Sequence, residues 1–329
     1  PRQNKNSPPP PSSTMKIAMF TNTYLPHVGG VANSVKTFAD EYRSLGHHVR
    51  IVAPTFPGSE QSSEDVLRMP AIQNFNGTDF SVRLAVPRTI TTFLDDFRPD
   101  ILHSHHPFLL GDAALRAGHE RNLPVIFTHH TLYEKYTHYV PMDSPALKRA
   151  AIKLAVEYAN LCSAVIAPSE SVRTLLKERG VETPITAIPT GVDLKRFRNG
   201  NGPRFRKQHG IPAEAKVIGH VGRLAEEKNL HFLAGSIGRC LHARQDTVAL
   251  IVGSGDAQES AAAQLHEWAD PDRVFMVGNR TGRDLVNAYA AMDLFAFSSQ
   301  SETQGMVLAE AMAARKPVVA LDASGVREI

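Results

Sequence analysis

The sequence predicts an α/β protein with two doubly wound, Rossmann-like domains that face each other across a cleft. Short continuous apolar runs alternate with helix-forming stretches, which is typical of βα units around a parallel sheet buried on both faces. The alternation stops over residues 189–210, where Gly, Pro, Asn and Arg predominate, and then resumes. A chain of 329 residues, 42% apolar and 21% charged, is long enough for two such domains.

The first domain is predicted over residues 15–193. Residues 1–14 hold a proline run and polar residues, so we expect a disordered leader with Met15 as the natural start. Apolar runs predict strands at 16–21, 48–53, 101–104, 124–128, 164–167 and 185–188, and helices at 31–45, 146–159 and 169–178. Residues 57–65 lack any pattern and are expected to form a mobile loop.

A linker is predicted over 194–210, followed by a second domain over 211–329. Its strands are expected at 217–221, 247–252, 274–277, 294–297 and 317–321, with helices at 261–268 and 307–314. In doubly wound domains, ligands bind at the loops that follow the carboxyl ends of the strands. Candidate functional residues are therefore expected in those loops.

Composition excludes several classes of protein. The net charge of +3 is too balanced to indicate a nucleic-acid partner. No apolar run approaches the roughly 20 residues of a membrane-spanning helix. Cys162 and Cys240 both lie in helix-like context, which favours reduced thiols and a cytoplasmic protein.

The loop after the strand at 294–297 carries two carboxylates, Glu302 and Glu310, on either side of Gly305. A glycine where a turn meets a helix lets backbone N–H groups approach an anionic ligand, and the two carboxylates could accept hydrogen bonds from hydroxyl groups. The alternative is an ordinary helix start, with Ser301 as the cap and Glu302 at the positive end of the helix dipole.

Two further loops have the composition of a phosphate site. The loop over 222–229 contains Arg223 and Lys228, which could bind a diphosphate, Arg by its fork and Lys as a point charge. Gly29 and Gly30 lie at a helix start, without the spacing of a dinucleotide site. The alternative for Arg223 is a solvated side chain beside an exposed cluster at 226–228.

Histidines are concentrated after two strands of the first domain. They are His103, His105, His106, His129, His130 and His138. They could be metal ligands or hydrogen-bonded loop residues, and the second is favoured because no H-E-x-x-H or paired-Cys motif is present. The segment 270–272 reads Asp-Pro-Asp and is expected to be a turn. We therefore expect no catalytic metal and no cofactor.

These motifs together resemble the retaining glycosyltransferases of family 4, which have the GT-B fold. The resemblance covers residues 15–329 and rests on Gly222-Arg223-Leu224 with Lys228, the pair Glu302 and Glu310, and residues 189–193 and 311–314. It implies transfer of a hexose from a nucleotide sugar with retention at the anomeric carbon. It also implies that Arg223 and Lys228 hold the diphosphate, Glu310 the ribose and Glu302 the donor sugar.

The same resemblance implies further site residues. His130 matches the family histidine that meets the donor sugar, and Gly29 and Gly30 match the loop under the diphosphate. The remaining donor-side candidates are Gly253, Thr303, Gln304, Gly305 and Met306, and the acceptor-side candidates are Tyr24, His105, Tyr133 and Tyr136.

Within the family, residues 20–26, 103–108 and 129–139 resemble the branch that glycosylates diacylglycerol, usually from UDP-glucose. This implies a lipid acceptor and a peripheral place on the inner face of the cytoplasmic membrane. The helix at 146–158 would carry Lys148, Arg149 and Lys153 on one side, with Leu147, Ala151, Leu154 and Ala155 turned elsewhere. Alternatives are a soluble or polysaccharide acceptor with a mannosyl or other donor, a nucleotide-sugar epimerase, and an inactive binding module.

The chain departs from the family pattern at two places. Arg315 stands where relatives usually have Gly, at a helix end expected to be left-handed and strained by a side chain. The chain also stops at Ile329, where relatives continue. The second domain is therefore expected to be incomplete at its C-terminus.

Overall fold

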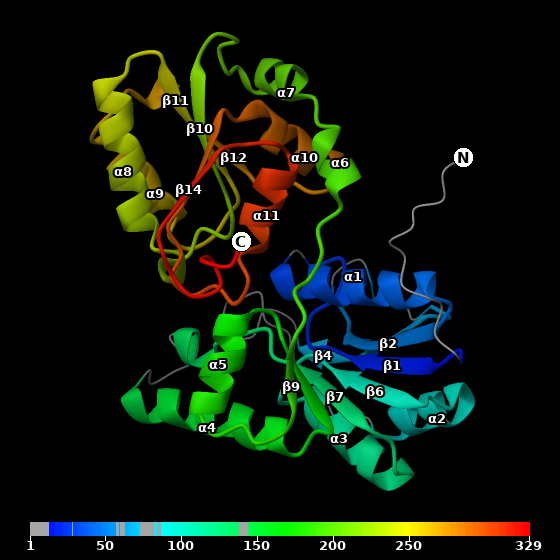
Figure 1. Cartoon of the computed structure of the whole chain (residues 1–329). Helices are drawn as coiled ribbons and strands as arrows, with labels where there is room; N and C mark the ends of the chain where they lie inside the picture. Colours follow the sequence, from blue (N-terminus) through cyan, green and yellow to red (C-terminus); the bar gives the residue numbers. More distant parts are fainter. Residues whose placement is uncertain are drawn as a thin grey trace. The chain divides into compact units, whose positions relative to one another are not determined.

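The computed structural model describes residues 13–27, 29–56, 59, 63–72, 82–83, 87–137 and 144–329. The chain forms two compact units, Pro1–Thr190 and Gly191–Ile329, and each is a parallel sheet with helices on both faces (Figure 1). This confirms the prediction of two doubly wound domains. Most of the expected leader, most of the loop at 57–65, and His138 lie outside the described residues.

The first unit contains a seven-stranded sheet in the order β3-β2-β1-β6-β7-β8-β9, with every neighbouring pair parallel. Its strands are β1 (Lys16–Phe20), β2 (His48–Pro54), β3 (Val66–Met69), β6 (Ile101–Ser104), β7 (Val125–Thr128), β8 (Ala164–Ala167) and β9 (Ile185–Ala187). A separate antiparallel pair joins β4 (Ala71–Ile72) to β5 (Val82–Arg83). The six strands expected in this unit end within one residue of their predicted bounds, whereas β3, β4 and β5 were not predicted.

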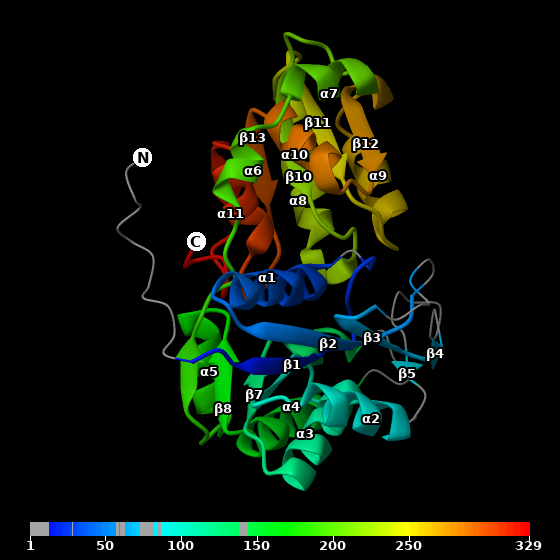
Figure 2. The same cartoon turned by 90° about the vertical axis from the view of Figure 1, so that its right-hand side faces the viewer.

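Helices cover both faces of this sheet because residues of β1 alternate between them. Ile17 and Met19 pack toward α1, whereas Ala18 and Phe20 pack on the opposite face, toward α2, α3 and α4 (Figure 2). The helices are α1 (Gly30–Ser44), α2 (Pro87–Phe97), α3 (Leu110–Arg121), α4 (Pro145–Asn160) and α5 (Glu170–Glu178), with the short 3₁₀ turn η2 (Tyr133–Lys135). No helix of the described residues is both long enough and apolar enough to cross a membrane.

The second unit contains a five-stranded parallel sheet in the order β12-β11-β10-β13-β14. The strands are β10 (Lys216–Val221), β11 (Thr247–Val252), β12 (Val274–Gly278), β13 (Leu294–Phe297) and β14 (Val318–Ala320). The helices are α6 (Leu194–Arg198), α7 (Gly202–His209), α8 (Leu230–Ala243), α9 (Gln258–His266), α10 (Gly282–Ala291) and α11 (Met306–Ala313). Two apolar clusters form the core: α8 and α9 cover one face, and α6, α7, α10 and α11 cover the other (Figure 1).

The prediction of a linker over 194–210 is wrong, because this segment forms α6 and α7 and packs on α10 and α11. Phe197 and Phe205 are buried in the core of the second unit. The side chain of Asn201 accepts a hydrogen bond from the Arg204 N–H and caps α7. A Cβ on Gly202 would lie 2.4 Å from the Ala290 carbonyl oxygen. The Gly, Asn and Pro residues thus serve capping and close packing, and the composition alone does not distinguish this from a flexible linker.

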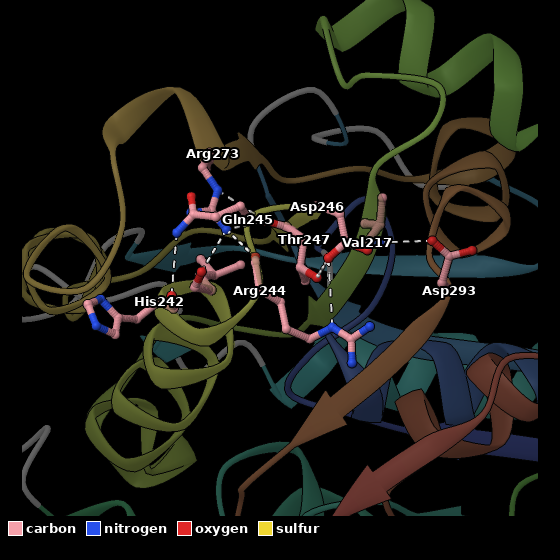
Figure 3. A network of polar contacts seen from close by, with 9 residues as sticks. Val217, His242, Arg244, Gln245, Asp246, Thr247, Arg273 and Asp293 are labelled. Carbon is pink, nitrogen blue, oxygen red and sulfur yellow. Dashed lines mark hydrogen bonds and ion pairs between the residues drawn. The ribbon is translucent and has the colours of Figure 1, made fainter.

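The Asp-Pro-Asp segment leads into a 3₁₀ turn, Pro271–Arg273, as expected from its composition. Figure 3 shows the guanidinium of Arg273, which donates hydrogen bonds to the carbonyl oxygens of Leu241, Arg244 and Thr247. These contacts fix the end of α8 to the start of β11. The turn is therefore a structural element at the amino ends of the strands, away from the loops where ligands are expected.

Arg315 follows the end of α11 in a left-handed conformation, with φ of +61°. Its N–H donates to the carbonyl oxygen of Met312. The strained helix end expected from the sequence is confirmed. A side chain in this conformation costs about 1 kcal/mol relative to glycine.

Candidate active site

Two loops of the second unit are tied together at the carboxyl end of the sheet. One follows β10 and contains the 3₁₀ turn η4 (Glu226–Lys228), and the other follows β13. The Ser298 hydroxyl lies 3.0 Å from the carbonyl oxygens of both Lys228 and Asn229. The Ser301 hydroxyl donates to the carbonyl oxygen of Glu227 at 3.0 Å. Ser301 therefore holds one loop to the other and is not the cap of α11, so the ordinary helix start weighed above is wrong.

The ion pair between Lys228 and Glu302 lies between these two loops. The Lys228 Nζ and Glu302 Oε1 atoms are 2.7 Å apart, and the two side chains are only 15% and 19% exposed. Burial alone would raise the pKa of Glu302, but the charge and hydrogen bond of Lys228, together with Ser299 and His220, outweigh burial, and the pKa is lowered. The site thus pairs a carboxylate with a lysine, and of the cluster at 226–228 considered as the alternative, only Glu226 is exposed.

Arg223 forms a second ion pair, with Glu227. The Glu227 side chain is only 4% exposed, whereas about a third of the Arg223 side chain is accessible to solvent. A buried carboxylate therefore orients a guanidinium that remains partly accessible to solvent. Glu227 was not identified from the sequence, where it appeared as one more charge in a polar loop.

Glycines bring the backbones of the loops after β10 and β11 into contact. A Cβ on Gly253, at φ of +141°, would lie 1.8 Å from the Gly222 carbonyl oxygen, so no side chain fits there. The Leu224 N–H donates to the carbonyl oxygen of Ser254 at 2.9 Å. Gly305 has φ of +69° and precedes α11 directly, as the turn-to-helix pattern predicted. Thr303 and Gln304 lie between Glu302 and this glycine, and Met306 is the first residue of α11.

Glu310 lies on α11 and accepts a hydrogen bond from the phenol of Tyr289. The Tyr289 hydroxyl is 2.8 Å from Glu310 Oε2, and Tyr289 is fully buried. Burial raises the pKa of Glu310, and the Tyr289 hydrogen bond and the charge of Arg196 offset only part of that rise. Neither Tyr289 nor Arg196 was predicted to belong to the site. A tyrosine in the apolar stretch 285–292 is indistinguishable by sequence from an ordinary core residue.

In the first unit, the strands end in a cluster of histidines. His103 Nε2 is 2.7 Å from the Thr128 hydroxyl, and His105 Nδ1 is 2.8 Å from His130 Nε2. The rings of His105 and His130 are stacked, with centroids 5.1 Å apart. His106 Nδ1 accepts a hydrogen bond from the Asn22 N–H. The loops after β1, β6 and β7 are thereby joined. His103, His105, His106 and His130 are hydrogen-bonded as favoured above, whereas neither buried ring nitrogen of His129 has a hydrogen-bond partner in the described structure.

These imidazoles are neutral at physiological pH. Burial lowers the pKa of His103 and His106 to about 3, and that of His129 to about 4. Burial and the neighbouring histidines lower the pKa of His105 and His130 well below the usual value. Within the described ranges, no three His, Cys, Asp or Glu side chains are arranged to hold a metal ion.

The other first-unit candidates differ in their accessibility to solvent. Tyr24 is buried, and the Arg68 guanidinium lies 5.6 Å from the centre of its ring. Tyr133 packs edge-on against Phe108, with ring centroids 5.1 Å apart, and Tyr136 is partly exposed. Tyr136 is therefore better placed than Tyr24 to meet a ligand from solvent.

Gly29 and Gly30 form the start of α1. A Cβ on Gly30 would meet no atom within 4 Å, so packing within the protein does not require glycine there. One turn further on, the Ser34 hydroxyl lies 2.6 Å from the hydroxyl of Thr190, the last residue of the first unit. The helix start is thus open, while the helix itself is held to the end of the unit.

The outer face of α4 is both basic and apolar. Lys148, Arg149 and Lys153 are exposed, as expected. Leu154 is 52% exposed and Leu161, just after the helix, is 72% exposed. Leu154 is exposed, and Ala155, Val156, Tyr158 and Ala159 supply the buried face of α4.

Both units match models of known protein families. The family model for Glycosyltransferase Family 4 matches residues 28–196, and that for Glycosyl transferases group 1 matches residues 202–329. An alpha-monoglucosyldiacylglycerol synthase of Streptococcus pneumoniae is 29% identical over 320 residues, which are 93% of this chain and 71% of that protein. A GDP-mannose-dependent alpha-mannosyltransferase of Corynebacterium glutamicum is 30% identical over 321 residues, 94% of this chain and 73% of that protein.

Solved structures show the same fold. The crystal structure of Anabaena Alr3699/HepE in complex with UDP-glucose has a TM-score of 0.72 at 23% identity, covering 95% of this chain and 82% of that one. Sucrose-phosphate synthase from Thermosynechococcus elongatus has a TM-score of 0.74 at 20% identity, covering 95% and 82%. Together with the two family matches, these similarities show that the chain belongs to glycosyltransferase family 4 and has the GT-B fold.

Proposed function

We propose that this chain is a retaining glycosyltransferase that moves glucose from UDP-glucose to a lipid acceptor such as diacylglycerol. The observation that carries the donor side is the largely enclosed Lys228–Glu302 ion pair, together with Arg223 and the glycine turns of the neighbouring loops. The similarity to an alpha-monoglucosyldiacylglycerol synthase supports the glucosyl donor and the lipid acceptor.

The cations would neutralise the diphosphate. When the donor binds, its phosphates compete with Glu302 for Lys228 and with Glu227 for Arg223. Both cations are already held in place, so little reorganisation is needed as negative charge develops on the leaving group. Glu302, displaced from Lys228, would then accept hydrogen bonds from hydroxyls of the donor sugar, and Glu310 would accept those of the ribose.

Retention follows if departure and attack occur on the same face of the sugar. The bond from the anomeric carbon to the diphosphate breaks, the acceptor oxygen bonds to that carbon, and the acceptor proton passes to the departing phosphate oxygen. A neutral His130, paired with His105, can donate or accept a hydrogen bond near this oxygen without adding a charge. No metal ion or cofactor enters the proposal.

A mannosyl transfer from GDP-mannose is the second candidate, because a GDP-mannose-dependent alpha-mannosyltransferase is 30% identical over 94% of this chain. The two proposals share the roles of Arg223, Lys228 and Glu302, since these groups meet the diphosphate and the sugar in either case. They differ in the donor base, the sugar and the acceptor.

One labelling experiment distinguishes glucosyl transfer, mannosyl transfer, epimerisation and binding without catalysis. The protein is incubated with radiolabelled UDP-glucose or GDP-mannose, together with diacylglycerol vesicles or a soluble glycan. A labelled lipid from UDP-glucose, with the donor's anomeric configuration by NMR, is the expected result. A labelled mannoside supports the second candidate, an isomerised sugar nucleotide indicates an epimerase, and no product with any donor indicates a binding module.

A further inference from the structure

We propose that Tyr289 is a positioning residue for the donor: it holds one oxygen of Glu310 so that the carboxylate is fixed to accept the hydrogen bonds of the nucleotide's ribose hydroxyls. This inference rests on the proposed function, and it assigns a role to a residue that does not itself touch the ligand.

The position of Tyr289 is fixed by the core. Its ring is fully buried on α10 and packs edge-on against Phe197, with centroids 5.6 Å apart, and at 5.8 Å from Phe295. Its hydroxyl lies 2.8 Å from Glu310 Oε2, with the Val307 carbonyl oxygen at 3.4 Å as a weaker neighbour. The phenol therefore reaches Glu310 from a rigid base, and its direction is set by packing.

The chemistry of the pair gives the hydrogen bond one direction. An ionised carboxylate only accepts, so the Tyr289 hydroxyl must donate. Packing alone would be served equally well by phenylalanine, which has the same ring and no buried polar atom. The hydroxyl thus has one evident use in the described structure, which is to orient and charge-stabilise the Glu310 carboxylate.

The charged state of Glu310 depends on few groups. Tyr289 on α10 and Arg196 on α6 both favour the carboxylate, against the burial that raises its pKa. Without the phenol, the pKa of Glu310 would rise further, and a larger fraction of the carboxyl would be protonated in mildly acidic solution. A protonated Glu310 would be a poorer acceptor for ribose hydroxyls.

Binding of a nucleoside diphosphate tests the inference without turnover. Wild-type protein and the variant Tyr289→Phe are titrated by calorimetry with UDP and GDP, and with the 2′,3′-dideoxy analogue of each. We expect Tyr289→Phe to weaken the preferred ribonucleotide roughly tenfold, as loss of a charge-assisted hydrogen bond implies, and to leave the dideoxy analogue unchanged. In the Glu310→Gln background, Tyr289→Phe should have no further effect on affinity.

Two readouts separate positioning from a purely structural role. The acid limit of ribonucleotide binding, which is the pH below which affinity is lost, should move to higher pH in Tyr289→Phe. The reason is that the phenol no longer lowers the pKa of Glu310. The control Tyr158→Phe removes another buried phenol, one that donates to Ser104 and Gly111, and should change stability without changing either affinity or the acid limit.

Two outcomes would refute the role of Tyr289 but leave the proposed function standing. One is an equal loss of affinity for the ribonucleotide and its dideoxy analogue, which indicates general damage. The other is unchanged ribonucleotide affinity and acid limit in Tyr289→Phe. Failure of the wild-type protein to bind either UDP or GDP refutes the proposed function as well, and is thereby distinguished from both.

Discussion

The strands of the first unit end in buried, neutral imidazoles, whereas those of the second unit end in ion pairs. His105 and His130 are hydrogen-bonded to each other and have strongly lowered pKa values. Glu302, in contrast, is paired with Lys228, and this partner helps to lower the pKa of its carboxyl despite burial. The same sheet architecture therefore presents neutral side chains at the strand ends of one unit and ion-paired side chains at those of the other.

Under the proposed function, this difference matches a division of roles between the two units. A diphosphate carries charge that only cations can offset, so the unit expected to hold it presents Lys228 and Arg223. An acceptor hydroxyl and a sugar need directional hydrogen bonds without a strong field, which neutral imidazoles supply. Four predictions test this division, in order of decreasing effect.

The first prediction is that acid unfolds the first unit before the second. Among the described residues, five histidines of the first unit have lowered pKa values, against His209 and His220 in the second. An unfolded chain protonates histidine near pH 6.5, whereas the folded one resists protonation down to about pH 3 to 4 at His103, His106 and His129. The contribution of these histidines to the free energy of unfolding is therefore complete above about pH 6.5. It falls as the pH decreases below that value, by about 1.4 kcal/mol per pH unit for each histidine.

Intrinsic chromophores follow the two units separately. The only tryptophan, Trp268, lies in the second unit, and six of the seven tyrosines precede residue 190. On acid titration, the tyrosine circular dichroism signal should be lost at a higher pH than the Trp268 fluorescence signal changes. Coincident transitions, or loss of the tryptophan signal first, would contradict the comparison.

The second prediction concerns the charged loops. Arg223→Ala and Lys228→Ala should each lower kcat/KM by about 10- to 100-fold, since a charge-assisted hydrogen bond to an enclosed phosphate contributes about 1.5–3 kcal/mol. Lys207→Ala removes an exposed cation from the same unit and serves as the control. Steady-state kinetics with each variant checks this, and wild-type kcat/KM in Arg223→Ala or Lys228→Ala would refute the donor site.

The third prediction places membrane contact on the first unit alone. The exposed face of α4 combines Lys148, Arg149 and Lys153 with Leu154. Each basic residue near an anionic bilayer contributes about 1 kcal/mol, so the double variant Lys148→Glu with Lys153→Glu should bind anionic vesicles at least about 30-fold more weakly. Binding should be salt-sensitive and absent with neutral vesicles in a sedimentation assay.

A matched control lies on the second unit. Lys195 on α6 and Lys207 on α7 are exposed, and changing both to Glu alters the net charge by the same amount. This pair should leave vesicle binding largely unchanged. An equal loss in both double variants would show that only net charge matters, and an unaffected α4 variant would favour a soluble acceptor.

The sequence predicted the sheets better than the side-chain partners. Strands such as β6 and β11 were predicted with their observed bounds because a buried parallel strand leaves a continuous apolar run between polar turns. Lys228 and Glu302 were both assigned to the donor site by the family resemblance, and the structure brings their loops together because β10 and β13 are neighbours. Their direct ion pair was not predicted, because it depends on rotamers set by the folded loops.

Partners that come from the core could not be identified in advance. Tyr289 and Glu227 stabilise site residues from buried positions, and a buried tyrosine or a carboxylate in a charged loop has no distinctive sequence pattern. The prediction of a linker over residues 194–210 was wrong for the same reason. Gly202 and Asn201 look like flexible residues until the neighbouring α10 is known to need a close approach and a capping group.

The fourth and smallest effect is on stability at the ends of two helices. Arg315→Gly should raise the free energy of unfolding of the second unit by about 0.5–1 kcal/mol, because glycine removes the strain of the left-handed backbone. The greater entropy of glycine in the unfolded chain opposes this gain and limits its size. Asn122 ends α3 of the first unit at φ of +52°, and asparagine tolerates this conformation, so Asn122→Gly should change stability by much less. Urea unfolding followed by Trp268 fluorescence for the first variant, and by tyrosine circular dichroism for the second, measures both changes. A destabilised Arg315→Gly variant would mean that contacts of the arginine side chain outweigh its backbone strain.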